Sequence, residues 1–326
     1  MRTMRGVVFS IVLLIAVFVA KGYSAELNAD IVPPALRDGF TLAFSVLIES
    51  IPFIILGIAL SVLVQVWLPE EWLFRILPSR PLPRRLVISL LGMFLPVCEC
   101  GNVPLARGLV AKGYSVSDSM TFLIAAPIIN PVTIITTHQA FGWDNGILVA
   151  RILGAIVIAN ILGWLFSKHS EPFSLLTPRF AAQCERPEAT GSSGRVAKSV
   201  DMFAREAAVL MPALIVGSMV AGAIQVLVSR DQLVALGSDP LLSVLAMMAL
   251  AFVISICANV DSFFILPFAD TFLPGSLVAF LLLGPIVDIK MLALMRTTYR
   301  SSTLLRLTVL VVSLTAAIGM GVNLVA

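Results

Sequence analysis

Charged residues are scarce in this chain of 326 residues. Aspartate, glutamate, lysine and arginine make up only 13% of the sequence, whereas hydrophobic residues make up 59%. A soluble domain is about one quarter charged and about half apolar. The composition therefore excludes an ordinary soluble protein and predicts a polytopic membrane protein. The net charge of +3 is small, and we expect no binding to nucleic acid.

Histidine, cysteine and the motifs of soluble enzymes are also lacking. His138 and His169 are the only histidines, which excludes a histidine-rich metal site. The four cysteines do not predict a disulfide framework, because Cys98 and Cys100 are too close in sequence for an unstrained ring. A phosphate-binding glycine loop and a nucleophile elbow are absent. We expect no cofactor, and any transport by this chain would have to be driven by an ion gradient or by the gradient of its substrate.

Apolar runs long enough to span a bilayer recur along the chain. They cover residues 40–68, 117–138, 146–166, 206–228, 276–295 and 304–325. A shorter run, 7–20, follows Arg2 and Arg5 and predicts an N-terminal signal-anchor helix. A cleavable signal peptide is the alternative, because Tyr23-Ser24-Ala25 resembles a cleavage site. The expected location is the cell inner membrane, with multiple passes through the lipid bilayer.

Two short segments interrupt the apolar pattern. The first extends from Leu95 to Pro104 and holds Cys98, Glu99, Cys100 and Asn102 between two prolines. Proline and glycine break the hydrogen-bond ladder of a helix, so this segment is predicted not to continue as one. The second break is predicted at Cys257–Asp261, inside the region 241–273. Such breaks are tolerated in a membrane where they are buried in protein or line a watery cavity.

The two halves of the chain resemble each other in sequence. Matching residues recur at offsets of 157 to 160, namely Pro52, Gly57 and Gln65 with Pro212, Gly217 and Gln225, Cys100–Val103 with Cys257–Val260, and Pro127–Asn130 with Pro285–Asp288. The predicted segments are 1–39 (signal-anchor helix and external segment), 40–167 (first permease repeat), 168–205 (cytoplasmic linker) and 206–326 (second permease repeat).

The distribution of basic residues predicts how these segments cross the membrane. The loop at Arg75–Arg85 and the linker 168–205 are both basic, which places both on the cytoplasmic side. This requires the Cys98 segment to enter and return as a re-entrant hairpin. The predicted fold is therefore all-α, with two inverted repeats, each of three transmembrane helices plus a broken or re-entrant helix hairpin. Secondary transporters of this kind bind substrate where the repeats meet.

The cysteines at the two breaks suggest the chemistry of binding. Cys98, Cys100 and Cys257 could converge as three sulfur ligands, and thiolates favour soft species such as trivalent arsenic or antimony, copper(I) or mercury. Glu99 could accept the protons that the thiols release. The alternative is that these cysteines are inert, because buried cysteine commonly serves packing alone.

Polar residues at membrane depth are the remaining candidates, because they are costly there and usually functional. Further substrate-binding candidates are Asn102, Asn130 and Asn259, of which the first two have the alternative role of orienting broken helices. Candidates for proton or ion coupling are Asp261, Asp288 and Glu49; the alternatives are helix capping for the aspartates and an ion pair for the glutamate.

Three basic residues near the ends of apolar runs are expected at the membrane surface. Arg107 and Lys112 would anchor the first hairpin at the interface. Lys290 would extend its ammonium group along the helix toward water.

Two signatures are similar to those of the predicted permeases of the ArsP type. The first is Phe94–Arg107 with Lys112-Gly113 and Ala126–Pro131, and the second comprises Cys257, Asp261 and Gly284–Lys290. The resemblance covers about residues 40–325. It implies a permease that exports trivalent organoarsenicals such as methylarsenite and recognises them through cysteine thiols. By motif match, the implied positions are Cys98, Cys100 and Cys257.

Two other functions remain open at this stage. The chain could be a permease for a different solute, such as another metalloid, a metal or a small anion, with structural cysteines. It could also be a membrane thiol oxidoreductase that cycles Cys98 and Cys100 through a disulfide, although the strained spacing disfavours that ring.

Overall fold

The computed structural model describes residues 33–69, 77–95, 97–143, 145–185, 194–227 and 240–325. These residues form helices and connecting segments, and one isolated bridge joins Leu176 and Tyr299. The prediction of an all-α protein is confirmed for these ranges. The predicted signal-anchor helix at 7–20 lies outside the described residues.

The helices follow one another in two similar series. The first is α2 (Pro34–Trp67), α4 (Pro81–Leu90), η1 (Leu91–Phe94), α5 (Glu99–Ala111), α6 (Val116–Ala125), α7 (Pro131–Phe141) and α8 (Ile147–Ser167). The second is α10 (Arg195–Leu227), α12 (Pro240–Ile254), α13 (Asp261–Ile265), η3 (Leu266–Phe268), α14 (Pro274–Ile286), α15 (Ile289–Met295) and α16 (Ser301–Val325). Between them lie η2 (Pro172–Leu175) and α9 (Pro178–Cys184).

Several of these helices are long and apolar enough to cross a membrane. Among the described residues they are α2, α8, α10, α16 and the pair α14–α15, five in all. The prediction of a multi-pass membrane protein is thereby confirmed. The helix that contains the fourth apolar run is longer than predicted, because α10 begins at Arg195 rather than at 206.

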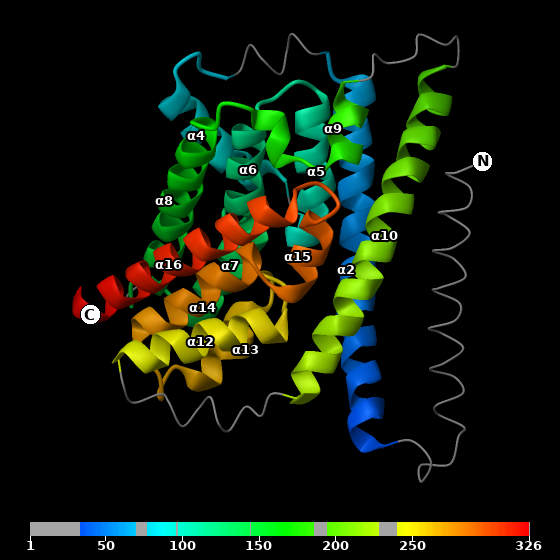
Figure 1. Ribbon diagram of the computed structural model, residues 1–326. Helices are drawn as coiled ribbons and strands as arrows, with labels where there is room; N and C mark the ends of the chain where they lie inside the picture. The colour runs from blue at the N-terminus through cyan, green and yellow to red at the C-terminus, as the bar shows by residue number, and fades with distance from the viewer. Residues whose placement is uncertain are drawn as a thin grey trace.

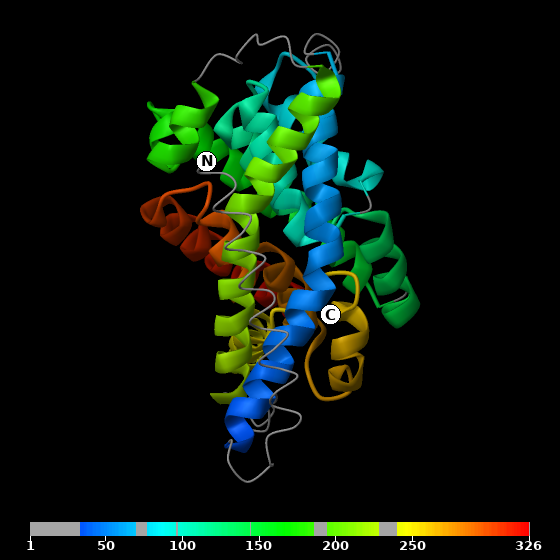
Figure 2. The same cartoon turned by 90° about the vertical axis from the view of Figure 1, so that its right-hand side faces the viewer.

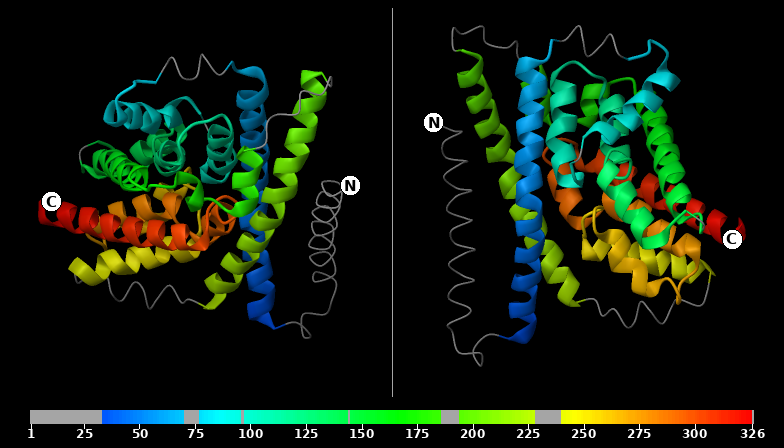
Figure 3. Two further views of the ribbon diagram at one scale, coloured as in Figure 1. Left: turned by 45° about the horizontal axis from the view of Figure 1, so that its top comes forward. Right: turned by 180° about the vertical axis from the view of Figure 1, so that it is seen from behind.

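The long helices α2 and α10 lie side by side, and α12, α14 and α16 lie across them as a stack (Figure 1). Figure 2 and Figure 3 show the same paired column from other directions. Small residues allow the close contact within the pair. A Cβ atom on Gly222 would lie only 2.6 Å from the backbone nitrogen of Ala43 and from the carbonyl oxygen of Gly39.

One predicted full span is wrong. Residues 117–138 do not form a continuous helix, because α6 ends at Ala125 and α7 begins at Pro131. Pro127 and Pro131 have no backbone N–H to continue the ladder, and Asn130 takes an extended conformation that caps α7. The run 276–295 is interrupted in the same way, between the end of α14 at Ile286 and the start of α15.

The first predicted break is shorter than expected. Helix α5 begins at Glu99 and runs through Pro104, so only the residues just before Glu99 leave the helical path. Pro104 lies near the start of α5, where its missing N–H deprives only the carbonyl of Cys100 of a partner in the ladder. The cysteines therefore lie at the N-terminus of a helix.

The described part of the linker is folded against the second half. The backbone N–H of Thr177 donates to the carbonyl oxygen of Thr298 (2.8 Å), and that of Arg300 donates to Leu175 (3.0 Å). Phe180 of α9 is buried. This segment therefore holds the connection between α15 and α16.

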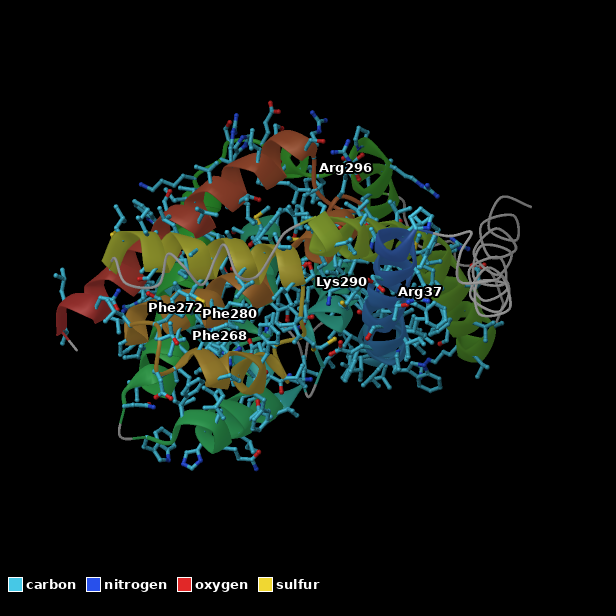
Figure 4. All side chains as sticks on the ribbon, turned by 90° about the horizontal axis from the view of Figure 1, so that it is seen from below. Arg37, Phe268, Phe272, Phe280, Lys290 and Arg296 are labelled. Carbon is cyan, nitrogen blue, oxygen red and sulfur yellow. The ribbon has the colours of Figure 1, made fainter. Side chains whose placement is uncertain are left out.

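Phenylalanine rings hold the short helix α13 against α14. Phe264 stacks on Phe280 with 5.9 Å between ring centroids and also contacts Phe268, which contacts Phe272. Figure 4 shows three of these side chains gathered at one end of the molecule. The cluster fixes the position of the segment that follows the second break.

Candidate functional site

The three cysteines predicted as ligands are brought together. The sulfur atoms of Cys98 and Cys100 lie within 4.8 Å of each other and of a Glu99 carboxylate oxygen, and the Cys257 thiol donates to Oε2 of Glu99 (3.4 Å). Cys98 precedes α5, Cys100 lies in its first turn, and Cys257 lies in the break before α13. All three side chains are buried, and none of the described cysteines forms a disulfide. The two breaks therefore contact each other through Glu99, Cys257 and Ala258.

Glycine allows the helix with two of these thiols to approach α2. A Cβ atom on Gly101 would lie 2.6 Å from the carbonyl oxygen of Phe53. A Cβ atom on Gly57 would overlap the backbone of Gly101 in the same way. In the second half, a Cβ atom on Gly217 would lie 3.2 Å from the Cα atom of Lys290. The matched glycines of the two halves thus both pack against a helix of the site.

Lys290 reaches the same cluster, which the sequence did not predict. Its ammonium group lies 3.0 Å from Oε1 of Glu99 and 3.4 Å from the carbonyl oxygen of Ser255. The side chain is 2% exposed. The expectation that Lys290 extends toward water is wrong, and the reason is the buried carboxylate that it neutralises. Figure 4 shows Lys290 in the interior, whereas Arg296 lies near the surface.

Glu99 is linked to the second half through both oxygens. While Oε1 accepts from Lys290, Oε2 accepts from the Cys257 thiol (3.4 Å) and from the backbone N–H of Ala258 (3.5 Å). The sulfur atoms of Cys98 and Cys100 and a carboxylate oxygen of Glu99 lie within 4.8 Å of one another. The carboxylate therefore has a direct contact with a thiol, and it carries a compensated charge.

The coupling candidates Asp288 and Glu49 lie around this pair. Asp288 caps α15 by accepting from the backbone N–H of Met291 (2.5 Å), as the capping alternative expects. Its Oδ2 atom is buried and has no hydrogen-bond partner among the described residues. Glu49, half-buried on α2, interacts electrostatically with Lys290 and Glu99. The ion pair that the structure gives to Lys290 is with Glu99.

The three asparagines have different surroundings. Asn130 caps α7 and donates to the carbonyl oxygens of Val97 (2.7 Å) and Leu95 (3.3 Å), so it ties two breaks together. Asn259 accepts from the Thr133 hydroxyl (3.1 Å). Asn102 is fully buried, and its amide has no hydrogen-bond partner in the part of the chain that the structure describes.

Asp261 forms a buried ion pair with Arg151, a residue that the sequence analysis missed. The guanidinium nitrogens lie 3.0 and 2.5 Å from the two carboxylate oxygens. Arg151 also donates to the hydroxyls of Thr137 (2.6 Å) and Ser262 (2.9 Å). The only available signal was an arginine inside an otherwise apolar span, which requires a partner.

The chain matches a family described as predicted permease, the ArsP type, over residues 35–324. It is 35% identical over 263 residues to UPF0718 protein YcgR of Bacillus subtilis, which covers 80% of this chain and 88% of that protein. It is 32% identical over 278 residues to a protein of Streptococcus mutans named putative two-component membrane permease complex subunit, which covers 84% of this chain and 91% of that protein.

A third relative is more distant. UPF0718 protein YraQ of Escherichia coli is 28% identical over 139 residues, which is 42% of this chain and 38% of that protein. No solved structure matches the chain. The family match spans both breaks and all the helices around them, and the chain belongs to the ArsP-type family of predicted permeases.

Proposed function

We propose that the protein exports a soft, thiol-reactive solute, a trivalent organoarsenical, across the cell inner membrane. The observation that carries the proposal is the position of three reduced, buried thiols from both halves of a permease around one carboxylate, that of Glu99. Cys98, Cys100 and Cys257 would hold the arsenic atom, since sulfur is the preferred donor for a soft centre.

The chemistry suits a buried site. A trivalent organoarsenical in water carries two hydroxyl groups on arsenic. Each thiol that binds forms an arsenic–sulfur bond, and the displaced hydroxyl leaves as water with the thiol proton. Neither the charge nor the oxidation state of the site changes, which matters because burying an uncompensated charge is costly. The third thiol can replace one of the first two by exchange, and water reverses the bonds on release.

Glu99 would move the thiol proton during this exchange. Its Oε2 atom already accepts from the Cys257 thiol, and its Oε1 atom accepts from the Lys290 ammonium group. The free amide of Asn102, one turn along α5, would bind a hydroxyl of the solute, whereas Asn130 and Asn259 hold the surrounding breaks in place.

We also propose that the halves act as inverted repeats, each with three crossings and a broken hairpin. The matched residues Asn130 and Asp288 support this, because each caps the second helix of an interrupted pair. Transporters with inverted repeats expose a central site to each side in turn. We assign proton or ion coupling to Glu49 and Asp288, since Asp261 is engaged by Arg151.

Uptake of methylarsenite into everted membrane vesicles tests the proposal. We expect Cys98→Ala, Cys100→Ala and Cys257→Ala each to lower the uptake rate by about tenfold or more, because each removes a sulfur ligand. Cys184→Ala is the matched control and should keep the normal rate, because Cys184 lies in α9, away from the cluster.

Normal methylarsenite uptake in Cys98→Ala and Cys100→Ala would reject the thiol site. A parallel comparison with antimonite, mercury and copper(I), in cells that lack their own exporters, separates the arsenical from other soft solutes. If a different solute is transported and the cysteine variants transport it normally, the cysteines are structural. A Cys98–Cys100 disulfide that forms and breaks during turnover would instead support the alternative that the protein is a membrane thiol oxidoreductase.

A further inference from the structure

Two buried ion pairs lie outside the thiol cluster, and the binding chemistry above does not use them. The first joins Arg107 of α5 to Glu206 of α10, with Nε 2.8 Å from one carboxylate oxygen and Nη2 3.4 Å from the other. Both side chains are at most 5% exposed. The expectation that Arg107 anchors a hairpin at the membrane surface is therefore wrong.

Further contacts surround this pair. Nη1 of Arg107 donates to the Thr298 hydroxyl (3.1 Å) and to the Thr297 carbonyl oxygen (3.2 Å). The guanidinium also lies over the ring of Phe180, 4.1 Å from its centroid. One arginine thus connects α5, α9, α10 and the segment after α15.

The second pair is Arg151 with Asp261, which joins α8 to α13. Both side chains are 1% exposed, and the hydroxyls of Thr137 and Ser262 surround them. The hydroxyls of Thr137 and Ser262 are also hydrogen-bonded to each other (3.0 Å). This pair closes the contact between α7, α8 and α13.

The two pairs lie on opposite sides of the thiols. Arg107 contacts α9, which lies toward one end of α2 in Figure 1, and α13 lies toward the other end. Arg107 is about 12 Å along α5 from Glu99, at the helical rise of about 1.5 Å per residue. In the predicted topology the basic linker 168–205, which includes α9, is cytoplasmic. The connection before Arg151, residues 139–146, has no basic residue, which favours the outer side.

We propose that these two ion pairs are the gates of the permease. Arg107–Glu206 closes the path from the thiols to the cytoplasm, and Arg151–Asp261 closes the path to the outside. Each pair joins a residue of the first half to a residue of the second, so relative movement of the halves separates it. The proposal rests on the proposed function, in which the site opens to each side in turn.

A charged pair is well suited to such a closure. When the pair separates, its two side chains lose their attraction to each other but become hydrated. The free energy lost and the free energy gained then nearly cancel. The same pair is expensive to split without water, because an unpaired buried charge is left behind. The gate therefore stays shut until the halves move far enough to admit water. With both pairs formed, the thiols are closed to both sides, as their burial indicates.

Side-specific thiol labelling tests the proposal without any arsenical. In a Cys184→Ser background, a membrane-impermeant maleimide is applied to everted and to right-side-out vesicles, and labelling of Cys98, Cys100 and Cys257 is measured by mass spectrometry. Glu206→Gln removes one charge of the first gate but leaves the other contacts of Arg107. It should raise labelling from the cytoplasmic side about tenfold or more.

Asp261→Asn should raise labelling from the opposite side by a similar factor, because Arg151 then lacks its counter-charge. Asp118→Asn is the matched control. It breaks a more exposed pair with Arg84 (2.8 Å), and both residues belong to the first half, so labelling should not change. Exchanging the charges with Arg107→Glu and Glu206→Arg should restore protection.

The gate proposal would be rejected if the thiols stayed protected from maleimide in both Glu206→Gln and Asp261→Asn. It would also be rejected if they were labelled equally from both sides of the membrane. A failure of the charge exchange to restore protection would reject it as well. The labelling results do not depend on which solute is transported. If labelling is side-specific but methylarsenite is not taken up, the gate proposal stands and the proposal that the solute is an organoarsenical is rejected.

Discussion

Lys290 shows how one buried charge organises the site. Its ammonium group meets a carboxylate from the other half and a carbonyl oxygen of the second break. That carbonyl belongs to Ser255, whose φ of 52° is left-handed, a conformation that L residues rarely take. The backbone strain is tolerated because it directs an oxygen at the ammonium group.

Replacing this lysine should therefore be costly. Lys290→Met leaves Glu99 as an unpaired buried charge, and we expect a loss of about 3–5 kcal/mol in the free energy of unfolding. Adding Glu99→Gln should recover part of that loss, because no charge then remains. Thermal unfolding of the detergent-solubilised protein measures both. Lys168→Met, at an exposed lysine over Trp164, should cost about 0.5–1 kcal/mol at most. Equal losses at the two lysines would contradict the buried pair.

Cys184 offers a prediction on pH dependence. Partial burial raises the pKa of its thiol from an ordinary 9.0 to about 11. Because only the thiolate reacts with maleimide, the labelling rate at pH 7.5 should be about a hundredfold below that of a free thiol. The rate should rise about tenfold per pH unit until it levels off near pH 11. The measurement uses a variant in which the other three cysteines are alanine, and a plateau near pH 9 would contradict it.

The sequence predicted some residues of the site and missed others. Cys98, Cys100 and Glu99 were found because they lie in a proline-bounded break, and Cys257 because it matches Cys100 in the repeat. Lys290 and Arg151 were not assigned to the site, since their partners are 191 and 110 positions away in sequence. A lone basic residue in an apolar run indicates that a partner exists, but only the fold identifies it.

At the scale of elements, the site depends on short helices that begin at breaks. Helices α5, α7 and α15 all start there, and the residue before each is Cys98, Asn130 or Asp288. A helix N-terminus carries partial positive charge, which favours nearby carboxylates and thiolates. The breaks therefore supply the positive polarity that thiolates and carboxylates favour.

The approach of α5 to α2 should be sensitive to a single methyl group. Gly101→Ala would place a Cβ atom 2.6 Å from the Phe53 carbonyl oxygen, and we expect a loss of about 1–3 kcal/mol together with faster labelling of Cys98 and Cys100. Thermal unfolding and maleimide labelling measure the two effects. Gly284→Ala is the control, because a Cβ atom there meets only Ala251 at an ordinary 3.7 Å. Similar behaviour of the two variants would argue against the tight contact.

The elements themselves were predicted unevenly. Apolar length alone identified α2, α8 and α16, because each of them runs as one continuous helix. The split of 117–138 was missed, since its proline pair lies within an apolar run of full spanning length. The early start of α10 was missed because its first turns are polar and pack beside α2, a contact that hydropathy does not report.

At the scale of the whole molecule, three buried ion pairs among the described residues join the halves. Glu99, Arg107 and Arg151 belong to the first, and each has its counter-charge in the second. A half that folded alone would bury these three charges without partners, at a cost of several kcal/mol each. The halves are therefore expected to depend on each other for their stability.

Splitting the chain tests this dependence. Two fragments, one ending at residue 185 and the other beginning at 194, should assemble when they are produced together, because helix packing and the three ion pairs remain available. A tag on the first fragment should then purify the second. The first fragment produced alone should accumulate to a much lower level, as its buried charges lack partners.

Replacing Glu99, Arg107 and Arg151 each by Gln should raise the level of the lone first fragment and weaken its capture of the second fragment. A lone first fragment that accumulates normally without these changes would contradict the mutual dependence, and with it the view that the binding site exists only where the two halves meet.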